Sequence, residues 1–127
     1  MDNLTIWHIN SQELEFDITE AESSERYETA LENLRKDIPK VKPSGIATST
    51  FIRAYCKAQR KLYDSIFGEG TAEKIFDGIP ESIRRYNAVY ASFLGFVGMQ
   101  TSTMRDEIDE IEKKYLPEKE TKGRAKK

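Results

Sequence analysis

Few side chains in this chain of 127 residues could catalyse a reaction. His8 is the only histidine, which excludes within one chain a metal site built on two histidines and a catalytic triad built on histidine. Cys56 is the only cysteine, and it has neither a Cys-x-x-Cys partner nor a helix N-terminus that would lower its pKa. We expect His8 on the surface of a strand and Cys56 as a buried, inert thiol.

Two further patterns resemble binding sites but have simpler explanations. Gly68-Glu69-Gly70-Thr71 precedes a predicted helix, where backbone amides can bind an anion, but it lacks the Lys-Ser/Thr pair of a nucleotide-binding loop. It predicts a helix stop followed by a helix that Thr71 caps. The carboxylates between Asp106 and Glu112 are interleaved with basic residues, which is typical of a solvated helix face. We predict no enzyme activity, no metal and no cofactor.

Composition sets the broad class. The chain is 38% apolar and 33% charged, which suits a globular protein with one modest core. The formal net charge is −2, so the chain lacks the excess of basic residues that nucleic-acid binding usually needs. The N-terminus has no secretory signal, and the longest apolar run is shorter than the roughly 20 residues that cross a bilayer. We expect a cytoplasmic protein with no nucleic-acid partner and no membrane partner.

Hydrophobic periodicity predicts the elements that would position a site. Alternating apolar and polar residues around Asn10-Ser11-Gln12 predict an N-terminal β-hairpin, whose apolar face must lie on a helix or on another hairpin. Helical spacing predicts four helices, the first with a Thr19/Glu22 capping box and the last with Pro80 in its first turn. The fold class is mainly α (α+β): a hairpin followed by a helical bundle with one long C-terminal helix. The hairpin spans 4–18, the helices span about 19–38, 47–67, 71–77 and 81–115, a single domain covers 1–116, and 117–127 is a flexible basic tail.

The long helix carries the most informative pattern. Its apolar positions recur every three or four residues from Ile83 to Tyr115, and only Gln100 interrupts them. At 1.5 Å per residue the helix is about 50 Å long, which exceeds the width of a small domain. Its second half, from Thr101, carries a narrow apolar seam suited to lying on the first helix or on another subunit. This seam consists of Met104, Ile108, Ile111 and Tyr115.

The segment Ala88–Met99 is apolar nearly all round, and the other long helices offer only one apolar stripe each to cover it. Gly95 and Gly98 cost the helix about 1 kcal/mol each relative to Ala, a cost that close approach of another backbone would offset. We therefore predict that this segment includes a protein-binding surface. Its partner-binding residues are predicted to be Tyr90, Phe93, Leu94, Phe96, Val97 and Met99.

Three segments resemble a known family. HINSQELEFDITEAESSERYETALENL (8–34) resembles an I-N-G-x-x-L-x-F-D hairpin followed by A-x-x-x-x-x-Y-E-x-A, with Ser11 in place of the usual glycine. YDSIFGEGTAEKIFDG (63–78) is similar to F-D-x-x-F-G-E-G-T-A-x-K-x-F-G, and the terminal GRAKK is similar to R-R-A-K-K. Small proteins that tailed bacteriophages of Gram-positive hosts encode between the major tail protein and the tape-measure protein share these motifs. No motif covers Ala88–Met99.

This resemblance implies a tail assembly chaperone, a non-enzymatic helical protein that coats the aggregation-prone tape-measure protein until tail-tube subunits polymerise around it. The implied partners are the tape-measure protein, further copies of the chain in a homo-oligomer, and the tail-tube protein. The implied location is the cytoplasm of the host bacterium, and the mature virion lacks the protein.

Two other functions stay open at the level of sequence. The first is a small phage-encoded regulator or inhibitor that binds a host protein through the acidic face from Asp106 to Glu112. The second is a nucleic-acid-binding module that uses the tail and the basic residues of the second long helix, which are Arg53, Lys57, Arg60 and Lys61.

Overall fold

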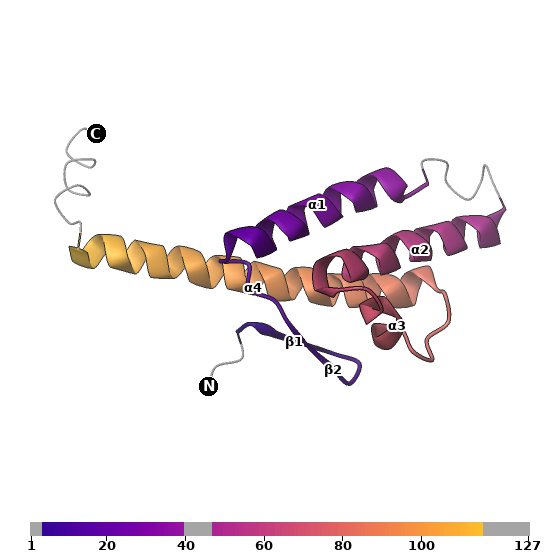
Figure 1. Cartoon of the computed structure of the whole chain (residues 1–127), viewed down its shortest axis with the longest axis horizontal. Coiled ribbons are helices and arrows are strands. Elements are labelled where there is room, and N and C mark those ends of the chain that lie inside the picture. The colour runs from indigo at the N-terminus through magenta and orange to yellow at the C-terminus, as the bar shows by residue number, and fades with distance from the viewer. Residues whose placement is uncertain (1–3, 40–46, 116–127) are drawn as a thin grey trace.

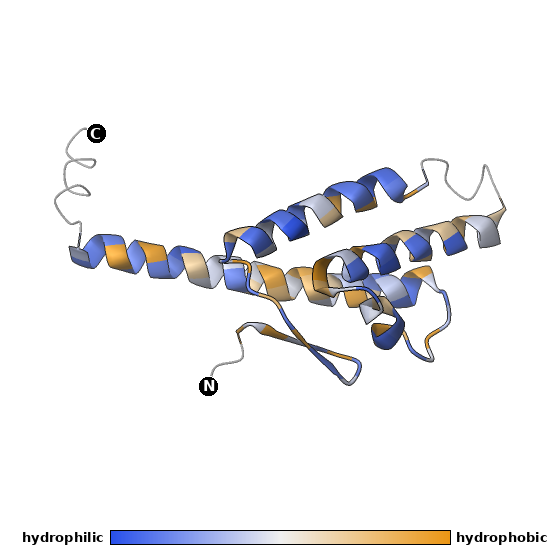
Figure 2. Ribbon diagram, in the orientation of Figure 1, coloured by the Kyte–Doolittle hydropathy of each residue, from blue (hydrophilic) through white to orange (hydrophobic). Residues whose placement is uncertain are grey.

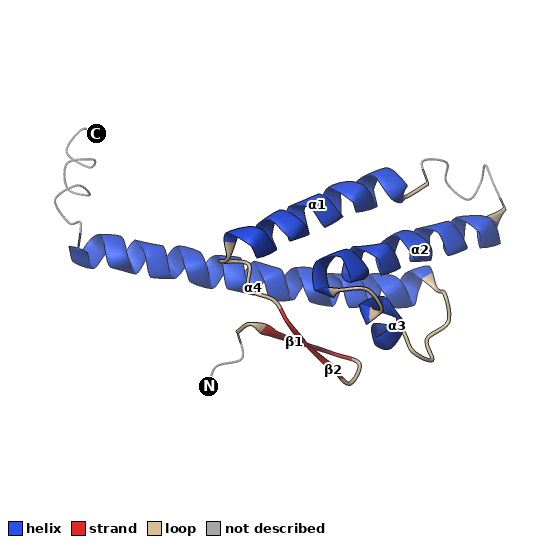
Figure 3. Ribbon diagram, in the orientation of Figure 1, coloured by secondary structure: helices blue, strands red, loops and turns tan. Residues whose placement is uncertain are grey.

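The computed structural model describes residues 4–39 and 47–115, and Figure 1 shows how its elements are arranged. A two-stranded antiparallel sheet is followed by four helices, the last of which is long, so the predicted fold class is confirmed (Figure 3). The basic tail 117–127 and the predicted bend at 40–45 lie outside the described residues. The elements are β1 (Ile6–Ile9), β2 (Gln12–Glu15), α1 (Ala21–Asp37), α2 (Thr48–Phe67), α3 (Thr71–Ile75) and α4 (Ile83–Tyr115).

A two-residue turn joins the strands of the hairpin. Asn10 and Ser11 both have positive φ angles, of 46° and 71°, as a type I′ turn requires. The Asn10 side-chain amide donates a hydrogen bond to the carbonyl of Ile75 at 3.0 Å, which fastens the turn to α3. In the register, Trp7 lies opposite Leu14 and Ile6 opposite Glu15, so the Trp7 face packs inward, as the alternation predicts.

Three helix starts differ from the expected capping. The side chain of Thr19 caps nothing, because its backbone amide and hydroxyl both donate to the Asp17 carboxylate, and α1 begins two residues later at Ala21. Gly70, in the left-handed conformation, is the N-cap of α3 in place of Thr71. The helix α4 begins after Ser82, whose hydroxyl accepts from the Arg85 amide at 3.2 Å, so Pro80 precedes the helix.

The core forms where the hairpin, α1 and α2 meet the first half of α4. Phe93 of α4 lies at its centre, fully buried, with its ring about 5–6 Å from rings of all three neighbours. Trp7 is also buried, between α2 and α4, and its indole N–H donates to Ser92 at 3.1 Å. The rings around Phe93 belong to Trp7, Phe16, Tyr27, Tyr63 and Phe67.

The second half of α4 extends beyond the other elements (Figure 1). From Arg105 to Tyr115 every residue is exposed, whereas the first half of the helix alternates buried and exposed positions. Colouring by hydropathy shows apolar residues continuing into this projecting part (Figure 2). The long helix is therefore the spine of the core in its first half and an extension in its second half.

Candidate protein-binding surfaces

Two of the six predicted partner-binding residues belong to the core. Phe93 is 0% exposed and Val97 is 4% exposed, so neither side chain can contact a partner in this conformation. The prediction of a surface role is wrong for both, because they belong to the core that α4 forms with the hairpin, α1 and α2. Tyr90 and Phe96 are half-buried and pack against the edge of the core.

Leu94 and Met99 do reach the surface, where they are 37% and 62% exposed. They lie on the side of α4 that faces away from the core. Between them, Gly95 and Gly98 present bare backbone, and no atom of residues 4–39 or 47–115 lies within 4 Å of the position that a Cβ would take at either glycine. The close backbone approach expected from these glycines therefore does not occur within the described part of the chain.

We give the name outer face of α4 to the exposed residues between Ala88 and Met99 that are apolar or lack a side chain. A partner helix could approach the backbone closely at its glycines. Ser92, whose hydroxyl accepts from the Trp7 indole, is the exposed polar residue of the same segment. The residues of the outer face are Ala88, Ala91, Leu94, Gly95, Gly98 and Met99.

A second apolar surface follows the projecting half of α4, and we call it the distal stripe. It does not lie on α1: Ile108 is 51% exposed, Ile111 is 53% exposed and Tyr115 is 68% exposed. Met104, at its proximal end, is partly covered and lines a hollow of about 190 Å³ together with Leu4, Thr5 and Asp17. The residues of the distal stripe are Met104, Ile108, Ile111 and Tyr115.

Gln100 has a role that its residue type did not predict. The side chain is 5% exposed, and its amide group donates to the carbonyls of Leu4 and, at 2.7 Å, Phe16. Its carbonyl accepts from the backbone amide of Ile18 at 2.9 Å. These bonds attach the chain at both ends of the hairpin to α4. The only available signal was the polar interruption of an apolar stripe.

The groups considered for catalysis are placed as follows. Cys56 is 0% exposed, and burial, with the nearby Glu81 carboxylate, raises the pKa of its thiol. His8 is exposed on β1 with its Nδ1 atom 3.7 Å from the Glu13 carboxylate. Over residues 4–39 and 47–115, no group of three His, Cys, Asp or Glu side chains could hold a metal ion.

The glycine-rich segment before α3 does not form an anion site. The Asp64 carboxylate accepts a hydrogen bond from the Ala72 amide at 2.9 Å, so a negative charge already occupies the start of the helix. A phosphate would be repelled from that position. Gly68 and Gly70 have φ angles of 118° and 92°, which explains why glycines stand there.

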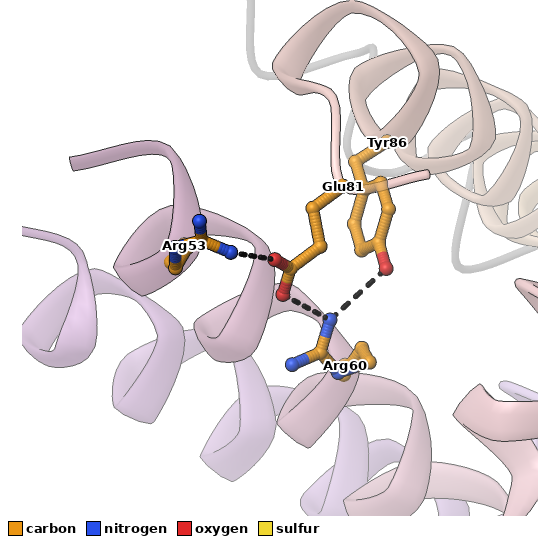
Figure 4. A network of polar contacts seen from close by, with 4 residues as sticks. All are labelled: Arg53, Arg60, Glu81 and Tyr86. Carbon is orange, nitrogen blue, oxygen red and sulfur yellow. Dashed lines mark hydrogen bonds and ion pairs between the residues drawn. The ribbon is translucent and has the colours of Figure 1, made fainter. Parts of the chain in front are cut away.

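The basic side of α2 is partly neutralised by two carboxylates. Glu81, in the segment before α4, lies between Arg53 at 3.4 Å and Arg60 at 3.1 Å, and Arg60 also donates to the Tyr86 hydroxyl (Figure 4). Lys61 forms an ion pair with Asp37 at 3.2 Å. Three of the four cations proposed for nucleic-acid binding thus have acidic partners, which weakens the positive potential on this side.

Comparisons with known proteins identify a family. A family model described as "Family of unknown function (DUF6673)" matches residues 10–127, so the chain belongs to that family. No curated protein and no solved structure matches the chain. Within the described residues, no helix is both long enough and apolar enough to cross a membrane.

Proposed function

We propose that this member of the DUF6673 family is a phage tail assembly chaperone that binds and solubilises the tape-measure protein without catalysing a reaction. The outer face of α4 is the observation that carries the proposal. Leu94 and Met99 are exposed beside the bare backbone of two glycines, and this combination suits an apolar helix of a client protein. The motif of residues 63–78 adds the family resemblance.

The two glycines fit this role physically. Each lowers the helix propensity of an exposed position by about 1 kcal/mol relative to Ala, and no contact within the described residues requires the side chain to be absent. A client helix that packs across Gly95 and Gly98 gains contact area because its backbone comes closer. Leu94 and Met99 border the glycines and would pack beside that helix, and the flexible thioether of Met99 adapts to varied client sequences.

The proposal also includes where and when binding takes place. The chaperone acts in the host cytoplasm as a homo-oligomer, holds the tape-measure protein until tail-tube subunits replace it, and is absent from the mature virion. The competing function, a regulator that binds a host protein through Asp106–Glu112, uses a different surface. Substitutions on the outer face therefore separate the two.

Coexpression with overlapping fragments of the tape-measure protein tests the proposal. The wild-type chain is expected to move at least one fragment into the soluble fraction. The pair Leu94→Asp and Met99→Asp is expected to abolish this effect, because a client would have to bury two charges. Failure with every fragment, or undiminished rescue by the Asp variant, would contradict the proposal.

A Gly95→Ala/Gly98→Ala variant makes the test more specific. We expect its unfolding free energy to rise by about 1–2 kcal/mol, since the added methyl groups meet open space. We expect rescue of the client to weaken, because the same methyl groups hold a partner backbone away. Thr29→Ala, at an exposed position of α1, is the matched control, which should raise helix stability slightly and leave rescue unchanged. Full rescue by the more stable glycine variant would exclude close packing on this face.

A further inference from the structure

We propose that the distal stripe pairs with the same stripe of a second copy of this chain, as a short antiparallel coiled coil. The inference specifies a contact for the homo-oligomer of the proposed function, but it does not rest on client binding, which uses a different surface. The spacing of four, three and four residues between the members of the stripe places Ile108 and Tyr115 at a positions of a heptad, and Met104 and Ile111 at d positions. Such a stripe is exposed to water unless a partner covers it.

The charges beside the stripe select the occupant and its direction. Arg105 and Glu112 occupy e positions, and Glu107 and Lys114 occupy g positions; all four are exposed. No salt bridge found within residues 4–39 and 47–115 uses any of them. They are therefore available to a partner helix.

An antiparallel arrangement satisfies every one of these charges. Antiparallel coiled coils bring e next to e and g next to g, because reversing one helix exchanges its two flanks relative to the seam. Arg105 then meets the partner's Glu112, and Glu107 meets the partner's Lys114, with each contact repeated by the two-fold axis. A parallel pair would place g next to e and so bring Glu107 against Glu112 of the partner subunit, twice. The pattern thus disfavours the parallel arrangement electrostatically.

The body of the fold sets the register. In the register with these ion pairs, Met104 lies opposite the partner's Tyr115, and Ile108 lies opposite the partner's Ile111. Moving the partner one heptad toward the body would bring its Tyr115 level with the buried Val97. Moving it one heptad away would leave two apolar layers in place of four. The proposed register is therefore the one with the most contact that the folded body permits.

The hollow at the base of the projection matches this register. It is lined by Met104, Gln100, Leu4 and Thr103, and it encloses about 190 Å³. In the proposed pairing the partner's Tyr115 comes to the layer of Met104, at the mouth of this hollow. Leu4, which is 40% exposed, would be covered by the same ring. The pairing thus covers four exposed apolar side chains on each chain, which are Leu4, Ile108, Ile111 and Tyr115.

Four layers form a small interface compared with the roughly 1,200–2,000 Å² that stable complexes bury, so we expect a dissociation constant of about 10–100 µM. Sedimentation equilibrium on the full chain, from a few micromolar to several hundred micromolar, measures it. The wild type is expected to convert from monomer to dimer across this range. A monomer at every concentration would overturn the proposal.

Charge reversal tests the direction of pairing. Glu107→Lys places a lysine against the partner's Lys114 and is expected to weaken dimerisation at least fivefold; Lys114→Glu is expected to do the same. The double variant Glu107→Lys/Lys114→Glu should restore wild-type association, because each ion pair is re-formed with its signs exchanged. Stronger association of Glu107→Lys alone would indicate parallel pairing and overturn the proposal. Asp109→Lys, at an exposed b position away from the seam, is the control and should have a smaller effect.

A disulfide test does not depend on the strength of the ion pairs. Cys56 is buried, so cysteines introduced into the stripe are the reactive thiols. When Ile108→Cys and Ile111→Cys proteins are mixed and oxidised, antiparallel layers predict the mixed disulfide as the main product. A parallel pair would give each variant linked to itself, and the absence of any disulfide above the level of an Asp109→Cys control would also refute the pairing.

Discussion

Replacing Gln100 should separate the hairpin from α4 and lower the stability of the whole fold. Gln100→Leu keeps the approximate size of the side chain but removes two donors and one acceptor. The carbonyls of Leu4 and Phe16 and the amide of Ile18 then lose their partner. The side chain lies at the boundary between the core and the projecting half of α4, so the loss affects the attachment of the sheet.

The magnitude follows from the number of bonds. Each hydrogen bond contributes about 1 kcal/mol net, and a buried group without a partner costs about 1–3 kcal/mol. Leu4 is 40% exposed, so water can reach its carbonyl, whereas Phe16 is 2% exposed. The apolar gain from leucine offsets part of the loss. We expect the free energy of unfolding to fall by about 3 kcal/mol, which is a large share of the 5–15 kcal/mol typical of a domain.

Urea titration followed by tryptophan fluorescence measures the effect. Trp7 is the only tryptophan in the chain; it belongs to β1 and is buried against α2 and α4, so its emission reports the docking of the sheet directly. With a slope of about 1.5–2 kcal/mol per molar urea, the midpoint should fall by about 1.5–2 M. Thr101→Val is the control, because within the described residues the Thr101 hydroxyl donates only to the Val97 carbonyl of its own helix, and the change should shift the midpoint by less than about 0.5 M.

The Gln100→Glu variant tests the direction in which stability changes with pH. In Gln100→Glu, an ionised carboxylate would face the carbonyls of Leu4 and Phe16, so folding should raise its pKa above the ordinary value of about 4.3. Stability relative to wild type should then be highest below about pH 4 and fall as the pH rises through the raised pKa. If Gln100→Leu unfolds at the wild-type urea concentration, or Gln100→Glu shows no such pH dependence, the hydrogen bonds do not hold the hairpin.

Two further predictions concern the turn and a buried tyrosine. Ser11→Gly should raise the unfolding free energy by about 0.5–1 kcal/mol in thermal denaturation, because Ser11 has a φ angle of 71° that glycine adopts without strain; destabilisation would contradict the type I′ assignment. Tyr63→Phe should be neutral or stabilising by up to about 1 kcal/mol at pH 7, because the Tyr63 hydroxyl is buried and has no hydrogen-bond partner within the described residues. Burial raises the Tyr63 pKa, so wild-type stability should fall as the pH rises above about 10, and the phenylalanine variant should lose less; parallel curves in alkaline urea titrations would exclude this role.

Local patterns in the sequence determined the elements. Alternation predicted the hairpin, and three- and four-residue spacing predicted four helices whose starts and C-termini all lie within two residues of those observed. These features depend on neighbours a few positions apart, which the sequence displays directly. Helix caps were predicted less well because several side chains compete for the same amides, and at α1 the Asp17 carboxylate binds Thr19.

Tertiary structure alone decided which side of α4 is covered. Periodicity shows that a face is apolar but not whether a hairpin, a helix or nothing packs against it. Phe93 and Leu94 are adjacent in the sequence, yet Phe93 is buried and Leu94 is exposed. The role of Gln100 was beyond sequence reasoning for the same reason, since its hydrogen bond to Ile18 spans 82 positions of the chain. Contacts at that separation depend on how the elements pack, and only the folded chain brings them together.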